Sequence, residues 1–133
     1  MSDRATVTET LTETVTETVV RRHLQAFLEQ RGVDAIVSDY HDAAVFITEA
    51  KIHRGKQEIR GFFEDFLAAL PERAMERFSL ESLHFDQDIA YITWCVEDDI
   101  PLGTDTFVVA NGKIASQTFA MVSAGRATGE VRT

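Results

Sequence analysis

Residues 40–63 carry the clearest structural signal in this chain: YHDAAVFITEAKIHRGKQEIRGFF. The part up to Thr48 predicts a β-strand, and Gly55 predicts a turn before a helix. Beyond Gly55, apolar residues recur at the i, i+3, i+4 spacing that places side chains on one helical face: Ile59, Phe62, Phe63, Phe66, Leu67 and Leu70. Each stabilises the fold by roughly 1.5–3 kcal/mol if fully buried. We therefore expect this helix to lie across a concave apolar surface, such as a curled sheet.

The same block resembles a family signature. Tyr40 to Val45 is similar to Phe/Tyr-x-Asp-Ala-x-Val, and Gly55 to Phe63 to Gly-Lys-x-x-Ile-Arg-x-Phe-Phe. Both belong to the SnoaL-like and ketosteroid-isomerase-like branch of the nuclear-transport-factor-two-like superfamily. The resemblance, from about Val19 to Met121, implies an α+β cone: a strongly curved mixed or antiparallel sheet wrapped around three helices, with an internal apolar cavity. It does not imply one activity, because this fold hosts isomerases, cyclases, epoxide hydrolases, dehydratases and proteins without chemistry.

Composition fits one compact domain. The chain has 133 residues, of which 44% are hydrophobic, and this length can stabilise a core without staples. The single cysteine, Cys95, excludes an internal disulfide, and its strand-like setting indicates an inert apolar side chain. A net charge of −9 makes binding to nucleic acid or anionic membranes a poor expectation. With no membrane-length apolar run and no signal-peptide pattern, we expect a cytoplasmic protein.

The N-terminal segment repeats Thr-Glu-Thr before Leu or Val. Its period of four favours a helical stripe, whereas its threonines favour fraying, so we predict that residues 1–18 are a partly helical or disordered extension. The domain then spans residues 19–123. Its first helix is predicted to end at Arg31 with Gly32 as the C-cap, and a second, short helix to span about 33–39.

In the C-terminal half the apolar period changes to two, which predicts strands over about 77–86, 89–97, 104–110 and 113–123. Asn111-Gly112 is a strong hairpin signal, and Pro101 and Gly103 are expected to fall in a break between strands. Residues 124–133 are expected to form a loose tail. Shared faces of neighbouring strands predict that Trp94, Phe107 and Phe119 converge with Phe63 or Phe66 around one cavity.

Asp105 is the first candidate for chemistry, since it alternates onto the same face as Phe107 and Val109. A carboxylate there is costly unless it is paired or protonated. Its position resembles that of the protonated aspartic acid in the oxyanion hole of ketosteroid isomerases. The alternative is a structural aspartate that hydrogen-bonds a helix or a buried polar neighbour.

His23 is the second candidate, because the resemblance places it near the oxyanion tyrosine of those isomerases. A histidine there can donate a hydrogen bond or take a proton; the alternative is a satisfied histidine at the edge of the core. The isomerases place their general base just after the strand at 40–48. This chain has Thr48 there, and Glu49 can take that role only if a bulge intervenes.

Other residues are expected to line the cavity. Gln117 is predicted to share an inward face with Ala115, Phe119 and Met121 and to fix a ligand carbonyl, although an amide satisfied within the protein fits as well. The predicted ligand-binding set is Tyr40, Phe63, Phe66, Trp94, Phe107, Gln117, Phe119 and Met121. The spacing of His41, His53 and His84 predicts no metal site, and no cofactor is expected.

Two functional classes stay open. In the first, Asp105 and His23 act on a polyketide-, steroid- or terpenoid-like substrate as a cofactor-independent isomerase, cyclase or dehydratase. In the second, which the missing general base favours, the domain encloses a mostly apolar small molecule without chemistry. A homodimer is expected in both, joined through the outer sheet face at Tyr91, Thr93 and Cys95.

Overall fold

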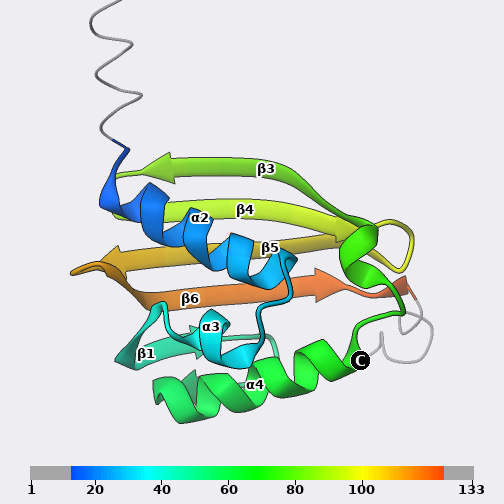
Figure 1. The fold of residues 1–133 in the computed structure, drawn as a ribbon, viewed down its shortest axis with the longest axis horizontal. Helices are drawn as coiled ribbons and strands as arrows, with labels where there is room; N and C mark the ends of the chain where they lie inside the picture. Colours follow the sequence, from blue (N-terminus) through cyan, green and yellow to red (C-terminus); the bar gives the residue numbers. More distant parts are fainter. Residues whose placement is uncertain (1–12, 125–133) are drawn as a thin grey trace, which may run out of the picture.

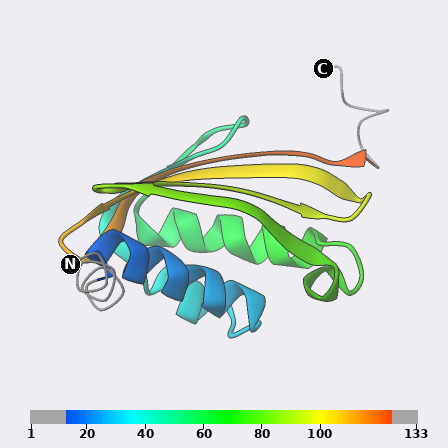
Figure 2. The ribbon, with the colours of Figure 1, turned by 90° about the horizontal axis from the view of Figure 1, so that it is seen from above.

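The computed structural model describes residues 13–124 and consists of a helical layer on one face of a curved sheet (Figures 1 and 2). The helices are α2 (Val15–Leu28), α3 (Val33–Val37), α4 (Gly55–Ala69) and a 3₁₀ turn, η1 (Ala74–Glu76). The strands are β1 (Tyr40–Ile47), β2 (Ile52–Arg54), β3 (Phe78–Asp86), β4 (Ile89–Val96), β5 (Ile100–Ala110) and β6 (Lys113–Val122). These elements confirm the predicted α+β class with three helices and a curved mixed sheet.

The six strands lie in the order β2-β1-β6-β5-β4-β3. Every neighbouring pair is antiparallel except β1 and β6, which run parallel. Most of the predicted extension, residues 1–12, lies outside the described part of the chain. Residues 125–133 of the predicted tail lie outside it as well. None of the helices within residues 13–124 has the length and hydrophobicity that spanning a membrane requires.

The N-terminal helix ends earlier than predicted, and it begins inside the segment that was predicted to be partly helical or disordered. Thr14 caps α2 by accepting a hydrogen bond from the backbone N–H of Glu17 (3.1 Å), which satisfies one of the free donors of the first turn. The helix ends at Leu28 rather than Arg31, because Gln30 adopts a left-handed conformation (φ 54°). Gly32 (φ 98°) therefore precedes α3 and does not cap α2.

The helix α4 confirms the amphipathic prediction. Ile59 and Phe63 are buried in the core, and the other apolar residues of its face pack against that core from partly buried positions: Phe62, Phe66, Leu67 and Leu70. The helix stops before Pro71, whose ring disfavours helical geometry in the preceding residue; Leu70 is accordingly extended (ψ 148°).

The sheet departs from the prediction at β5, which begins at Ile100 and runs through Pro101 and Gly103. Pro101 is tolerated because the registered pairs of β5 begin at Leu102, so no ladder bond needs its missing N–H. Gly103 is required by packing, since a Cβ there would lie 2.2 Å from Cε2 of Trp94. Gly103 does not break the strand; its missing side chain leaves room for the Trp94 indole.

A second departure is a bulge in β6. Val109 pairs with Ile114 and Val108 with Ser116, so Ala115 is an extra residue without a partner in β5. Strict alternation predicted that Ala115 shares the inward face of Gln117, and the bulge shows that this prediction is wrong. Ile114 takes the inward position and is fully buried. Asn111 and Gly112 both have positive φ, as the predicted tight hairpin requires.

Candidate functional site

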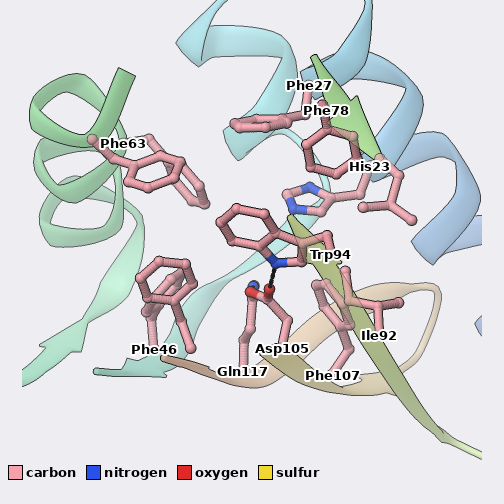
Figure 3. Close-up of a pocket in the computed structure, with 13 residues that line it drawn as sticks. His23, Phe27, Phe46, Phe63, Phe78, Ile92, Trp94, Asp105, Phe107 and Gln117 are labelled. Carbon is pink, nitrogen blue, oxygen red and sulfur yellow. Dashed lines mark hydrogen bonds between the residues drawn. The ribbon is translucent and has the colours of Figure 1, made fainter. Parts of the chain in front are cut away.

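The space between the helices and the inner face of the sheet contains a small cavity of about 40 Å³ (Figure 3). Side chains from α2, α4 and five strands line it: His23, Leu24, Phe27, Phe46, Phe63, Phe66, Phe78, Ile92, Trp94, Asp105, Phe107, Gln117 and Phe119. Protein interiors are otherwise close-packed, and a cavity of this size has room for only a few water molecules. A small free space therefore lies between the helices and the sheet.

The cavity has a buried interior and a more exposed rim. We call the partly exposed lining residues the mouth: Leu24, Phe27, Phe66, Phe78 and Phe119. The aromatic residues of the mouth contact one another and the Trp94 indole. The ring centroids of Phe66 and Phe119 are 5.5 Å apart, and those of Phe78 and Trp94 are 5.6 Å apart in a stacked arrangement. Aromatic rings therefore make up most of the partly exposed lining.

Most of the predicted ligand-binding residues lie around this one cavity. Trp94, Phe107, Phe119 and Gln117 meet both Phe63 and Phe66 there, as the period-two pattern of the strands predicted. Two predicted residues do not line the cavity, namely Tyr40, which is fully buried behind Gln117, and Met121, which is partly buried farther along β6. Whether any of these residues binds a ligand stays a prediction.

Asp105 is the acidic group of the cavity and is only 7% exposed. The indole Nε1–H of Trp94 donates to Oδ1 (2.8 Å), and the amide Nε2 of Gln117 donates to Oδ2 (2.8 Å). Burial raises the pKa of Asp105 to about 6, and these two hydrogen bonds limit the rise because they favour the ionised form. Both oxygens therefore accept, which differs from the protonated donor that the resemblance implied.

Gln117 connects Asp105 to a deeper polar chain. The hydroxyl of Tyr40 donates to Oε1 of Gln117, and Nε2 of His23 lies 3.5 Å from that hydroxyl. Trp94 and Gln117 donate directly to Asp105, and Tyr40 donates to Gln117, so this arrangement supports a carboxylate rather than a carboxylic acid. Asp105 and His23, which were predicted to act together, are thus joined only through two intervening side chains.

His23 is the last member of this chain and is buried near Asp39. Burial lowers the pKa of His23 to about 4, although the nearby Asp39 acts in the opposite direction. Nδ1 of His23 is buried without a hydrogen-bond partner and lies 3.8 Å from Oδ2 of Asp39, beyond hydrogen-bond distance. Asp39 is itself paired with Arg22, whose Nε donates to Oδ1 (2.7 Å). His23 is therefore neutral at pH 7.

No acidic side chain reaches the cavity from the position just after β1, where the isomerases place their general base. Thr48 lies just after β1, where its hydroxyl accepts hydrogen bonds from the backbone N–H groups of Ala50 and Lys51. Glu49 is exposed in this turn and is not among the lining residues. The bulge that would turn Glu49 inward does not occur, because the irregularity of β1 lies between Tyr40 and Val45.

Sequence reasoning missed several lining residues: Leu24, Phe27, Phe46, Phe78 and Ile92. The apolar stripe of α2 contains Leu24 and Phe27, but a stripe does not distinguish a cavity wall from close-packed core. The same holds for Phe46 and Ile92, whose alternation indicated only an inward face. Asp39 gave no local signal, since its partner Arg22 lies 17 positions away.

Comparison with known proteins places the chain in one family. The model of the SnoaL-like domain matches residues 20–117, whereas no curated protein sequence gives a significant match. A SnoaL-like protein of unknown function from Burkholderia thailandensis has a TM-score of 0.68 and 15% identity over 84% of this chain and 98% of its own. A "putative polyketide cyclase" from Sinorhizobium meliloti has a TM-score of 0.62 and 20% identity over 77% and 93%.

A de novo designed protein with a curved β-sheet also shares the fold, with a TM-score of 0.64 and 12% identity over 81% of this chain and 85% of its own. At such identities these likenesses concern the fold alone, and a designed neighbour illustrates that the fold does not carry an activity with it. The family model, in contrast, spans most of the chain. This protein belongs to the SnoaL-like domain family.

Proposed function

We propose that this domain binds a mostly apolar small molecule in the cavity between α2, α4 and the sheet. The observation that supports this most strongly is a free space lined by aromatic rings, with Asp105 and Gln117 as its buried polar groups. Apolar walls with a few placed polar groups are typical of small-molecule sites. Since the cavity measures about 40 Å³, a larger ligand enters only if the side chains of the mouth rotate outward.

Binding can be tested with a neutral apolar probe, cyclohexylmethanol, by isothermal titration calorimetry. Leu24→Phe adds bulk at the mouth and should abolish the binding seen with the wild-type protein. Leu28→Phe is the matched control, because Leu28 lies one turn along α2 at an exposed position outside the cavity lining. Undiminished binding to the Leu24→Phe variant would refute the proposed site.

Catalysis is the alternative. A carboxyl group with a pKa of about 6 is suited to proton transfer near neutral pH, and the Sinorhizobium protein is described as a "putative polyketide cyclase". An isomerase, cyclase or dehydratase acting on a polyketide-, steroid- or terpenoid-like substrate would need a second group. His23 is the other titratable lining residue, and its pKa near 4 leaves it neutral and a poor proton donor at pH 7. Binding without turnover is therefore the better-supported function.

We further propose that the outer face of the sheet joins two copies of the chain. Helices cover only the inner face (Figure 2). Two registered rows cross the outer face without an Asp, Glu, Lys or Arg side chain: His84, Tyr91, Thr106, Thr118 and Ile47 in one, and Ser82, Thr93, Thr104 and Ala120 in the other. Two molecules of charge −9 repel each other, so a neutral face is where copies can approach.

Light scattering at micromolar concentration tests this assembly. We expect twice the chain mass of 14.9 kDa for the wild-type protein. Thr106→Glu, which would place two like charges across the symmetric interface, should give the monomer mass, whereas Asp42→Asn at an exposed position away from both rows should remain dimeric. A wild-type monomer would overturn the proposal.

A further inference from the structure

We propose that the ligand of this cavity is an organic ammonium ion, with its nitrogen against Asp105 and its apolar body directed through the mouth. This inference rests on the proposed function and names the chemical class of the ligand. Three features of the cavity carry it: a carboxylate without a cationic partner, aromatic faces around it, and a size that fits a head group.

The first feature is the unbalanced charge. Among the ion pairs of residues 13–124, none involves Asp105, and no lysine or arginine lines the cavity. The other buried aspartate, Asp39, is paired with Arg22. A buried charge without a counter-charge is costly. Its two donors, Trp94 and Gln117, are neutral and leave further lone pairs of the carboxylate oxygens free to accept.

The second feature is the aromatic lining. Eight aromatic side chains surround the space in front of Asp105: Phe27, Phe46, Phe63, Phe66, Phe78, Trp94, Phe107 and Phe119. The faces of aromatic rings attract cations, and Trp is the strongest of them. Figure 3 shows the N–H edge of the Trp94 indole against the Asp105 carboxylate, and Phe78 and Phe119 stack on the indole, so an ammonium group bound to this carboxylate would lie among aromatic rings. Such a combination favours a cation over a neutral apolar molecule.

The third feature is size and access. A cavity of about 40 Å³ accommodates an ammonium head group but not a ring system. The partly exposed rings of the mouth then surround the apolar body of the ligand. The net charge of −9 also favours the approach of a cation from solution.

The test compares three probes that share one ring: cyclohexylmethylamine, cyclohexylmethanol and cyclohexanecarboxylate. Fluorescence of Trp94, the single tryptophan of the chain, reports binding inside the cavity, and the probes do not absorb where it emits. We expect the amine to bind at least about tenfold more tightly than the alcohol, and the carboxylate most weakly. Equal affinity for amine and alcohol would overturn the cation proposal and leave the proposed function intact. No binding of any probe would overturn both.

The variant Asp105→Asn should lower the affinity for the amine by about tenfold and leave that for the alcohol unchanged, because only the cation uses the charge. Asp42→Asn is the matched control, since the Asp42 side chain is 98% exposed, and it should change neither affinity. An amine affinity unchanged in Asp105→Asn would refute the proposal.

A pH series on the wild-type protein makes the test independent of the folding of that variant. Affinity for the amine should fall as pH drops from 7.5 to 5 through the Asp105 pKa of about 6, and affinity for the alcohol should stay constant. The groups facing Asp105 are Trp94 on β4, Gln117 on β6 and, behind it, Tyr40 on β1 and His23 on α2. None changes its charge in this range, because the pKa of Tyr40 is raised by burial and that of His23 is about 4. An amine affinity independent of pH would contradict the proposal.

Discussion

The two buried aspartates within residues 13–124 differ in their counter-charge: Asp105 begins the polar chain of Gln117, Tyr40 and His23, and Asp39 lies near the far end of that chain without a hydrogen bond to it. Asp39 is 3% exposed and pairs with Arg22, which reaches the surface. Asp105 is 7% exposed and receives only neutral donors, from Trp94 and Gln117. A carboxylate whose charge is balanced within the protein serves the fold. One whose charge is not balanced is available to something from outside, and this distinguishes the candidate site from the rest of the core.

The strongest way to disrupt the Asp105 end is to remove the space that holds Trp94. In Gly103→Ala, the new Cβ would lie within 2.2 Å of the indole, so Trp94 must move and its bond to Asp105 is lost. We expect a loss of about 3 kcal/mol in the free energy of unfolding, measured by urea denaturation. Gly61→Ala is the control, since nothing lies near a Cβ on that residue of α4. A neutral Gly103→Ala would show that the indole position is not fixed.

The comparison itself is tested by the same substitution at both ends. Asp39→Asn removes the charge that pairs with Arg22 and should destabilise the protein by about 2 kcal/mol at pH 7. The loss is limited because Arg22 is half exposed and water screens the ion pair. Asp105→Asn should stay within about 1 kcal/mol, because the lost charge-assisted bonds are offset by relief from burying an unpaired charge. Thermal melts of both variants against Asp42→Asn decide this. A larger loss for Asp105→Asn would reverse the assignment of roles.

The two ends should also differ in their response to pH. The native pKa of Asp105, about 6, exceeds its unfolded value of 3.8, so the native state binds the proton more tightly and Asp105 lowers stability as pH rises from about 4 to 6. His23 acts oppositely, because its native pKa of about 4 lies below 6.5 and its contribution is lost on acidification.

Removing Asp105 leaves only the His23 effect. Between pH 7 and pH 4, Asp105→Asn should therefore lose roughly 2 kcal/mol more stability than the wild-type protein. Urea denaturation at several pH values measures this difference. Parallel pH profiles for the two proteins would mean that burial does not raise the pKa of Asp105.

The smallest expected effect concerns the link between the ends. Tyr40→Phe removes the hydroxyl that joins His23 to Gln117 and leaves the buried Oε1 of Gln117 without its donor. We expect a loss of about 1–2 kcal/mol in the free energy of unfolding. In a double-mutant cycle, Tyr40→Phe should couple to Asp105→Asn, because Gln117 lies between the two positions. Additive effects would show that Tyr40 and Asp105 are not coupled through Gln117.

The sequence was sufficient to predict those features that repeat along the chain. The helical stripe of α4 and the alternation of β4 and β5 placed Phe63, Phe66, Trp94 and Phe107 correctly around one space. The errors occur at residues whose structural role depends on a contact with a residue far away in the sequence. Gly103 looked like a strand break because nothing nearby in sequence reveals the indole that lies across it, and the extra residue Ala115 is visible only in the pairing of β6 with β5.

The candidate site was predictable in its members but not in its connections. Alternation placed Asp105 and Gln117 inward, yet the donors that decide the state of Asp105 come from other strands, namely Trp94 and, through Gln117, Tyr40. The ion pair of Asp39 with Arg22 joins a helix to the residue before β1. Such pairings depend on the curvature of the sheet and on where α2 packs against it, and local sequence patterns specify neither.

The parallel pairing of β1 with β6 has a consequence for how the chain folds during synthesis. Tyr40 and Gln117, joined across these strands, lie 77 positions apart, and β6 is the last of the described strands to be synthesised. Strands β3 to β6 form successive hairpins from local contacts, whereas β1 has only the short β2 as a strand partner and α4 packed against it until β6 appears. Contacts over such separations form slowly because loop closure precedes them. The first strand of the nascent domain is thus the last to be placed, and this is the stage at which a chaperone would be of most use.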